Sequence, residues 1–98
     1  MAILVDPATW PGRGRLWCHL VSDTSFEELH AFAARCGIPG RAFERDHYDV
    51  PEDRRAEVVA AGATEVASRE LVRRITAGGL RRPKHRPPPG MRQRDLPR

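Results

Sequence analysis

Histidine and aspartate side chains that could act in catalysis or metal binding recur at short spacings in the first half of this chain. His19 is followed by Asp23, and the same residue types return at His47 and Asp49. Imidazole and carboxylate ligands together suit a divalent cation such as zinc, manganese or iron, and a cation with an open position can activate water for hydrolysis. Without a metal, a histidine oriented by a carboxylate can act as a general acid or base. We therefore take all four as candidate catalytic residues, and His19, His47 and Asp49 as candidate metal ligands.

Further residues could support such a site, and structural roles compete with the chemical ones. No two candidates lie four residues apart on one helix, and no HExxH motif is present, so the spacing specifies no known site. Asp23 and Asp49 also suit helix N-caps, and Asp6, which precedes a proline, suits a turn. The candidate supporting residues are Asp6, His30 and Tyr48.

Short apolar runs predict the strands that would position these side chains. Residues 2–5 and 16–21 are the clearest runs, and alternate residues of the second run face opposite sides of a sheet. Residues 41–44 and 63–66 are shorter candidates. Residues 8–15 contain a proline and two glycines, so we expect a loop there.

Three helices are expected around these strands. Capping-box patterns at residues 24–28 start the first helix, and Gly37 ends it. A helix-start signal at residues 49–52 begins the second, which runs to about residue 61. The third covers about residues 68–76. Its inward-facing apolar residues are expected to be Leu71, Val72 and Ile75.

This β-β-α-β-α-β-α order predicts an α/β fold with a small three- to four-stranded mixed sheet and three helices. The first connection is too short for a helical crossover, so the first two strands should be antiparallel. The later strand–helix–strand units should be parallel, right-handed crossovers. Ligands bind outside the carboxyl ends of the strands in open sheets of this kind. We therefore expect Asp23, His47 and Asp49 to meet in adjacent loops there, with His30 directed toward them.

Charge divides the chain into two parts. The 98 residues carry 17 basic and 13 acidic side chains, which gives a net charge of +4. Residues 79–98 alone contribute +6, from seven basic residues and one acidic residue, so residues 1–78 carry −2. The C-terminal part is also rich in proline. We expect a folded domain at residues 1–78 and a disordered tail at residues 79–98.

The expected tail could bind nucleic acid weakly and without sequence preference, through its positive charge. It contains no aromatic residue for base stacking, and a solvated extension without function is the alternative. The candidate contact residues are Arg81, Arg82, Lys84 and Arg86. A body of 78 residues buries only about 60% of its unfolded surface, so a homodimer would add stability.

The two cysteines and the hydropathy of the chain indicate the cellular compartment in which we expect the protein. Cys18 and Cys36 lack the spacing of metal or redox motifs, so we expect both in the core. No signal peptide is visible, and no apolar run is long enough to cross a membrane. We therefore expect a cytoplasmic protein with reduced thiols and no membrane partner.

Several stretches of the body resemble a family known from bacteria and phages as domain of unknown function 4031. The matching stretches are Leu4-Val5-Asp6, residues 17–23, residues 28–33, His47-Tyr48-Asp49 and Gly62-Ala63, so the resemblance covers about residues 2–75. It implies a shared outline and supplies no reaction. Family members often carry Phe-Gln where this chain has Phe43-Glu44, so we assign Glu44 no role.

Two functions of different classes fit these observations. The first is a hydrolase-like, metal-assisted site acting on a phosphate- or nucleotide-containing substrate. The alternative is a non-catalytic binding or adaptor domain whose basic tail contacts nucleic acid or an acidic partner. The separation of His19 and His47 discriminates between them, because side chains more than about 10 Å apart cannot share one metal ion at about 2 Å from each ligand.

Overall fold

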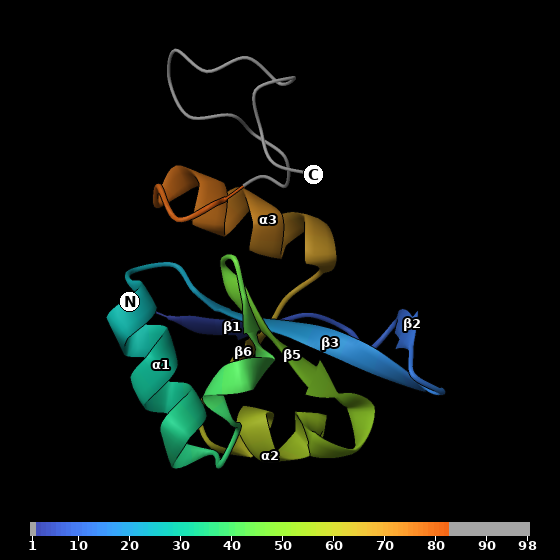
Figure 1. The fold of residues 1–98 in the computed structure, drawn as a ribbon. Coiled ribbons are helices and arrows are strands. Elements are labelled where there is room, and N and C mark those ends of the chain that lie inside the picture. Colours follow the sequence, from blue (N-terminus) through green and yellow to red (C-terminus); the bar gives the residue numbers. More distant parts are fainter. Residues whose placement is uncertain (1, 83–98) are drawn as a thin grey trace, which may run out of the picture.

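Helices cover both faces of a twisted sheet in the computed structural model, which describes residues 2–82 (Figure 1). Helix α3 (Ser68–Ala77) lies on one side of the sheet, and α1 (Phe26–Arg35) and α2 (Arg55–Ala60) lie on the other. The strands are β1 (Ile3–Val5), β2 (Trp10–Gly12), β3 (Arg15–Ser22), β4 (Phe43–Glu44), β5 (His47–Pro51) and β6 (Thr64–Glu65).

The sheet is mixed, which confirms the predicted fold class. Its strand order is β4-β5-β3-β1-β6, and β2 pairs with the beginning of β3. Strands β1 and β3 are antiparallel, as expected, whereas β1 and β6 are parallel. The sheet contains six strands among the described residues, so the prediction of three to four was too low. The additional strands are β2, inside the expected loop at residues 8–15, and β5.

The two expected parallel crossovers have different outcomes. Strand β4 runs parallel to β3 without pairing with it, whereas β4 and β6 run in opposite directions, so the second expectation is wrong. Strand β4 turns back at Arg45 and Asp46 into β5, and β5 is the strand that pairs with β3, in antiparallel orientation. The predicted strand at 41–44 therefore lies at the sheet edge, beyond β5. Strands β5 and β6 run in the same direction, but β3 and β1 lie between them.

Each face of the sheet has its own apolar core. Alternate side chains of β1 and β3 point to opposite faces, so the two strands contribute to both cores. The face under α1 and α2 includes Val5, Cys18, Leu20, Leu29, Phe32 and Val58. The face under α3 includes Leu4, Val21, Leu71 and Ile75. Val72 is 40% exposed, so its predicted inward position is wrong.

The helix ends correct two structural roles proposed from the sequence. Ser25, not Asp23, caps α1, and its hydroxyl accepts a 3.0 Å hydrogen bond from the Glu28 amide. Gly37 follows this helix with φ +72°, the left-handed conformation that glycine adopts readily. Asp49 does not cap a helix, because it lies inside β5. The chain instead enters α2 through a 3₁₀ turn at Glu52–Arg54.

Among residues 2–82 there is no helix long and apolar enough to cross a membrane. Residues 79–82 follow α3 and contact the domain through Arg81 and Arg82. The remainder of the predicted disordered tail lies outside the described residues.

Candidate metal centre

Antiparallel register brings the candidate residues together on the α3 face of the sheet. His19 of β3 is paired with Asp49 of β5, so both side chains point to the same face. His47 lies two residues before Asp49 and therefore shares that face. On the other side of β3, the Asp6 amide donates to the His19 carbonyl oxygen at 3.2 Å, which extends the row to the end of β1.

Three of these side chains come within reach of a single ion. One ligand atom from each of His19, His47 and Asp49 lies within 4.8 Å of the other two. The two imidazole ring centres are 4.9 Å apart, and His47 Nε2 lies 3.1 Å from Asp49 Oδ1. This separation is well below the limit that would exclude a shared site. The convergence occurs across neighbouring strands, not in carboxyl-end loops as expected.

Asp6 orients the first histidine. Its carboxylate accepts hydrogen bonds from the His19 amide at 2.6 Å and from the Ser68 hydroxyl at 2.7 Å. His19 Nδ1 lies 2.8 Å from the same carboxylate, so this nitrogen carries the proton and Nε2 presents its lone pair. The carboxylate has no exposed surface.

Asp46 holds the second histidine in the same way. Its Oδ1 lies 2.9 Å from His47 Nδ1, and its Oδ2 accepts a 2.9 Å hydrogen bond from the Arg82 amide. The Arg81 guanidinium lies 3.6 Å from the same oxygen. Asp46 is also buried. Both histidines are therefore fixed by a buried carboxylate on Nδ1, and their Nε2 atoms are directed away from it, that of His47 to within 3.1 Å of Asp49 Oδ1.

The electrostatics of the cluster favour a cation. Burial lowers the pKa of His47, but hydrogen bonds to Asp49 and Asp46 outweigh it and raise the pKa above its ordinary value. The hydrogen bond from His47 lowers the pKa of Asp49. Burial raises the pKa of Asp6, but the bonds from His19 and Ser68 bring it below its usual range. A positive charge between His47 Nε2 and Asp49 Oδ1 is therefore stabilised, whether a proton or a metal ion carries it.

A metal-binding histidine commonly donates its other ring N–H to a carboxylate, which fixes the tautomer and raises the basicity of the ligand. Here both histidines have that arrangement. Two histidines and one carboxylate make a three-ligand set that suits zinc, with one position left for water, or iron with open positions. The donor set therefore fits a borderline divalent cation.

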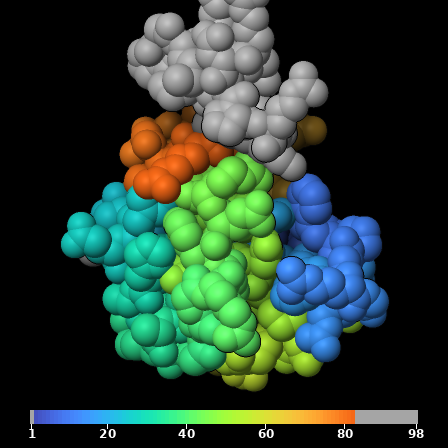
Figure 2. Space-filling model, in the orientation of Figure 1, coloured from blue at the N-terminus to red at the C-terminus, as the bar shows by residue number. Residues whose placement is uncertain are grey.

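The centre opens on two hollows. A cleft of about 820 Å³ lies on one side, and its lining includes Trp10, Arg13, His19 and Asp49. A slot of about 160 Å³ lies on the side toward α3 and includes His19, His47 and Arg45. Figure 2 shows the segments around residues 10–15 (blue) and 40–50 (green) on this face of the molecule.

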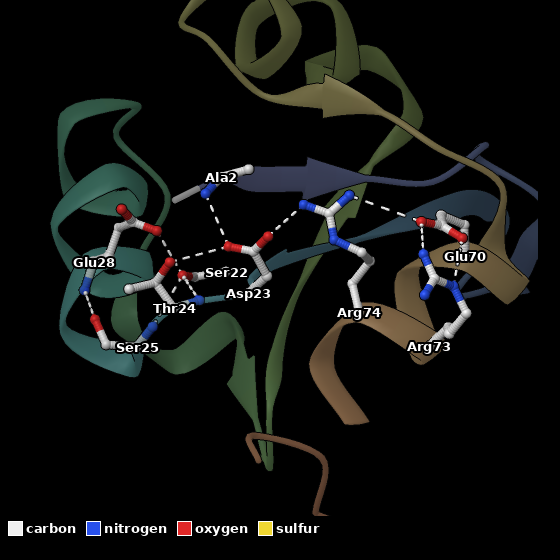
Figure 3. Close-up of polar contacts among 9 residues, drawn as sticks. All are labelled: Ala2, Ser22, Asp23, Thr24, Ser25, Glu28, Glu70, Arg73 and Arg74. Carbon is white, nitrogen blue, oxygen red and sulfur yellow. Dashed lines mark hydrogen bonds and ion pairs between the residues drawn. The ribbon is translucent and has the colours of Figure 1, made fainter. Parts of the chain in front are cut away.

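Asp23 lies apart from the centre, in a network that joins three segments (Figure 3). Its carboxylate accepts a 2.9 Å hydrogen bond from the Ala2 amide and pairs with Arg74 of α3. The Thr24 hydroxyl donates to the same group at 3.0 Å. The expectation that Asp23 joins His47 and Asp49 is therefore not met, because its partners hold it at the opposite end of β3 from the cleft.

His30 and Tyr48 are also directed elsewhere. Tyr48 alternates with His47 and Asp49 along β5, so it faces the other side of the sheet, where His30 Nδ1 lies 2.6 Å from its hydroxyl. Neither residue reaches the cluster. Of the candidate nucleic-acid contacts, Arg81 and Arg82 contact the β4–β5 turn, whereas Lys84 and Arg86 lie outside the described residues.

Three contributors were not identified from the sequence. Asp46 was passed over because it lies outside the alternation of His47 and Asp49, although it directly precedes His47. Ser68 is the first residue of α3, and its hydroxyl donates to Asp6 at 2.7 Å. Trp10 of β2 contacts the His19 ring, with 4.8 Å between the centroids. The sequence signal for this site is the spacing of His47 and Asp49, two residues apart on one strand, which does not reveal these three contributors.

The fold and this cluster define a small mixed α/β protein with a candidate two-histidine, one-carboxylate centre. The family model of a protein of unknown function, DUF4031, matches residues 3–78. The chain therefore belongs to the DUF4031 family, as its resemblance implied. Comparisons with curated proteins and with solved structures found no match.

Proposed function

We propose that this protein is a metal-dependent hydrolase that acts on a phosphate ester. One observation carries the proposal: ligand atoms of His19, His47 and Asp49 converge within 4.8 Å, and a buried carboxylate orients each histidine. Zinc, manganese or iron is the ion that this donor set suits. A carboxylate on Nδ1 is the arrangement common among metal-binding histidines.

The proposed hydrolysis requires an ion with three protein ligands and one coordination position open to water. His19, His47 and Asp49 would hold the ion, which would supply a position for water and lower the pKa of that water to about 7. The water oxygen bonds to phosphorus, the P–O bond to the leaving group breaks, and the released alcohol takes up the proton. Asp6 and Asp46 act as positioning residues in this scheme, since each holds the ring of one ligand histidine.

Arginines near the centre favour a phosphate as the substrate group. Arg13 and Arg41 line the cleft, and Arg45 and Arg81 line the slot. The positive charge of Arg13 also contributes to the lowered pKa of Asp49, after the larger effect of the His47 hydrogen bond. Guanidinium groups bind phosphate oxygens through paired N–H donors.

Metal content tests the first half of the proposal. The full chain, loaded with zinc or manganese and freed of excess metal, should retain about one ion per molecule by elemental analysis, as expected for a single three-ligand centre. His47→Ala and Asp49→Asn should lose that ion. His30→Ala is the matched control, because it removes a histidine from the opposite face, and it should retain the ion. Equal metal content in His47→Ala, Asp49→Asn and the unaltered chain would contradict the proposal.

Turnover tests the second half. Hydrolysis of bis(4-nitrophenyl) phosphate and 4-nitrophenyl phosphate should depend on added metal and stop with a chelator. Loss of either metal ligand should lower kcat by orders of magnitude, whereas the His30→Ala variant should keep full activity. If the metal-loaded protein cleaves neither ester, the hydrolase proposal is contradicted, whereas the metal centre is not.

A further inference from the structure

An exposed tryptophan lies directly beside the candidate metal centre. Trp10 is 52% exposed, and its ring meets the His19 ring edge-on with centroids 4.8 Å apart. Trp10 and His19 line both the cleft and the slot, so together they form the wall between the two hollows.

The neighbouring tryptophan does not offer the same surface. The Trp17 indole N–H donates to the Gly12 carbonyl oxygen at 2.8 Å. The guanidinium groups of Arg13 and Arg15 lie over its ring, at 5.7 and 5.9 Å from the centroid. Trp17 therefore anchors the β2–β3 hairpin and holds its arginines, whereas Trp10 keeps an open aromatic face beside the centre.

Several arginines around Trp10 have capacity for an anion. Arg15 pairs with Asp53 at 3.8 Å, but within residues 2–82 neither Arg13 nor Arg41 has a carboxylate within 4.0 Å. In the slot, Arg45 Nε is buried and has no hydrogen-bond partner among the described residues. A buried guanidinium nitrogen without a partner is costly. Arg45 also lines the slot, and guanidinium groups bind phosphate oxygens.

We propose that this site binds a nucleotide unit, with the nucleobase stacked on Trp10 and the phosphate directed to His19, His47 and Asp49. A flat π-system suits a nucleobase, and a cationic rim beside a metal-ligand set suits the phosphate attached to it, whereas a simple phosphate ester would use only the second feature. Base stacking on an exposed aromatic side chain is worth about 1–3 kcal/mol, with little preference among bases. Only the phosphate end of this inference rests on the proposed function.

Binding in the presence of a chelator separates this inference from the metal chemistry. The probes are thymidine 5′-monophosphate and ribose 5-phosphate, measured by calorimetry on the full chain with EDTA. The nucleotide should bind more tightly than the sugar phosphate. Trp10→Ala should weaken nucleotide binding about 5- to 150-fold and leave ribose 5-phosphate binding unchanged. Trp10→Phe should restore most of the loss, since phenylalanine can also stack.

Leu16→Ala is the matched control, because Leu16 is an exposed apolar residue of the same hairpin and does not line the cleft.

A short labelled oligothymidylate distinguishes a free nucleotide from a nucleotide unit within a nucleic-acid strand. A site for single-stranded nucleic acid should bind the oligonucleotide more tightly than the mononucleotide, in a Trp10-dependent way. Equal affinity for both phosphates, or no effect of Trp10→Ala, would overturn the inference. A Trp10→Ala variant that changes only the oligomeric state in size-exclusion chromatography would also overturn it. Nucleotide binding without any metal uptake would refute the hydrolase proposal alone.

Discussion

Asp46 is the residue whose role differs most from its appearance in the sequence. It is a buried acid in a tight turn, yet it contacts His47 on one oxygen and the Arg82 amide on the other. Burial raises the pKa of Asp46, but the Arg82 and His47 hydrogen bonds outweigh it and lower the pKa. The carboxylate therefore stays ionised and holds the His47 ring in one orientation.

The first prediction concerns this carboxylate. Asp46→Asn keeps the shape but removes the charge that fixes the His47 tautomer, so zinc affinity should fall about 10- to 100-fold. Competition with a chromophoric chelator measures the dissociation constant. Asp53→Asn is the control, because Asp53 is exposed and contacts no candidate ligand. An Asp46→Asn variant with unchanged zinc affinity would show that the carboxylate does not act through His47.

The second prediction concerns Asp23, whose role the structure makes architectural (Figure 3). Burial raises its pKa, but hydrogen bonds from Arg74, Ala2 and Thr24 bring it below the ordinary value of 3.8. Asp23 therefore stabilises the fold fully above pH of about 4, and this contribution disappears as the pH falls through its folded-state pKa. Asp23→Asn should cost about 2 kcal/mol at neutral pH.

Urea unfolding at a series of pH values measures this effect. The difference in unfolding free energy between Asp23→Asn and the unaltered chain should shrink as the pH falls below about 4. Zinc affinity at neutral pH should be unchanged, because the carboxylate does not reach His19. A difference that stays constant down to pH 3 would show that the Asp23 charge does not contribute.

At the level of elements, the end of α3 fits closely against the end of β3. A methyl group added at Gly78 would lie 2.6 Å from the Asp23 carbonyl oxygen, so the backbone itself blocks a larger residue there. Gly78→Ala should destabilise the fold by about 1–3 kcal/mol, through displacement of α3. Gly40→Ala, at a position with no atom within 4 Å of the added methyl, should be nearly neutral in the same thermal melt. Equal melting temperatures for the two variants would contradict the close fit.

The elements also show where sequence interpretation succeeds and fails. The capping serine and the apolar stripe of α1 predicted that helix well, because both signals are local. Strand β5 was missed because its polar residues, His47 and Asp49, face the candidate centre and so resemble a loop. Strand β2 was missed because Pro11 and Gly12 are typical of turns, although a proline is tolerated in a strand that pairs on one side.

The choice of strand partners lay beyond local patterns. Strand β4 does run parallel to β3, as a crossover requires, but the turn at Arg45 inserts β5 between them. Arg45 has φ +56°, an uncommon conformation for a non-glycine residue. An arginine side chain gives no sequence signal for a turn of this kind. The composition of the candidate site was therefore predictable in part, whereas the register that assembles it was not.

For the whole molecule, we expect metal binding at the candidate centre to stabilise the fold. Its ligands come from β3 and β5, the central strands of a small domain, and the supporting carboxylates come from the end of β1 and the β4–β5 turn. An ion that binds only the folded chain raises the free energy of unfolding by RT ln(1 + [L]/Kd). At a free concentration 100 times Kd this amounts to about 2.7 kcal/mol.

The melting temperature should report this coupling directly. In a domain of this size, 1 kcal/mol shifts the Tm by about 4–8 °C, so zinc at that concentration should raise the Tm by about 10–20 °C. The shift should grow with the logarithm of the zinc concentration and should vanish in His47→Ala and Asp49→Asn. His30→Ala alters the Tyr48 contact on the other face, so it should lower the starting Tm while keeping the full shift. A zinc-dependent shift that persists in both His47→Ala and Asp49→Asn would contradict binding at this centre, whose three converging ligands are His19, His47 and Asp49.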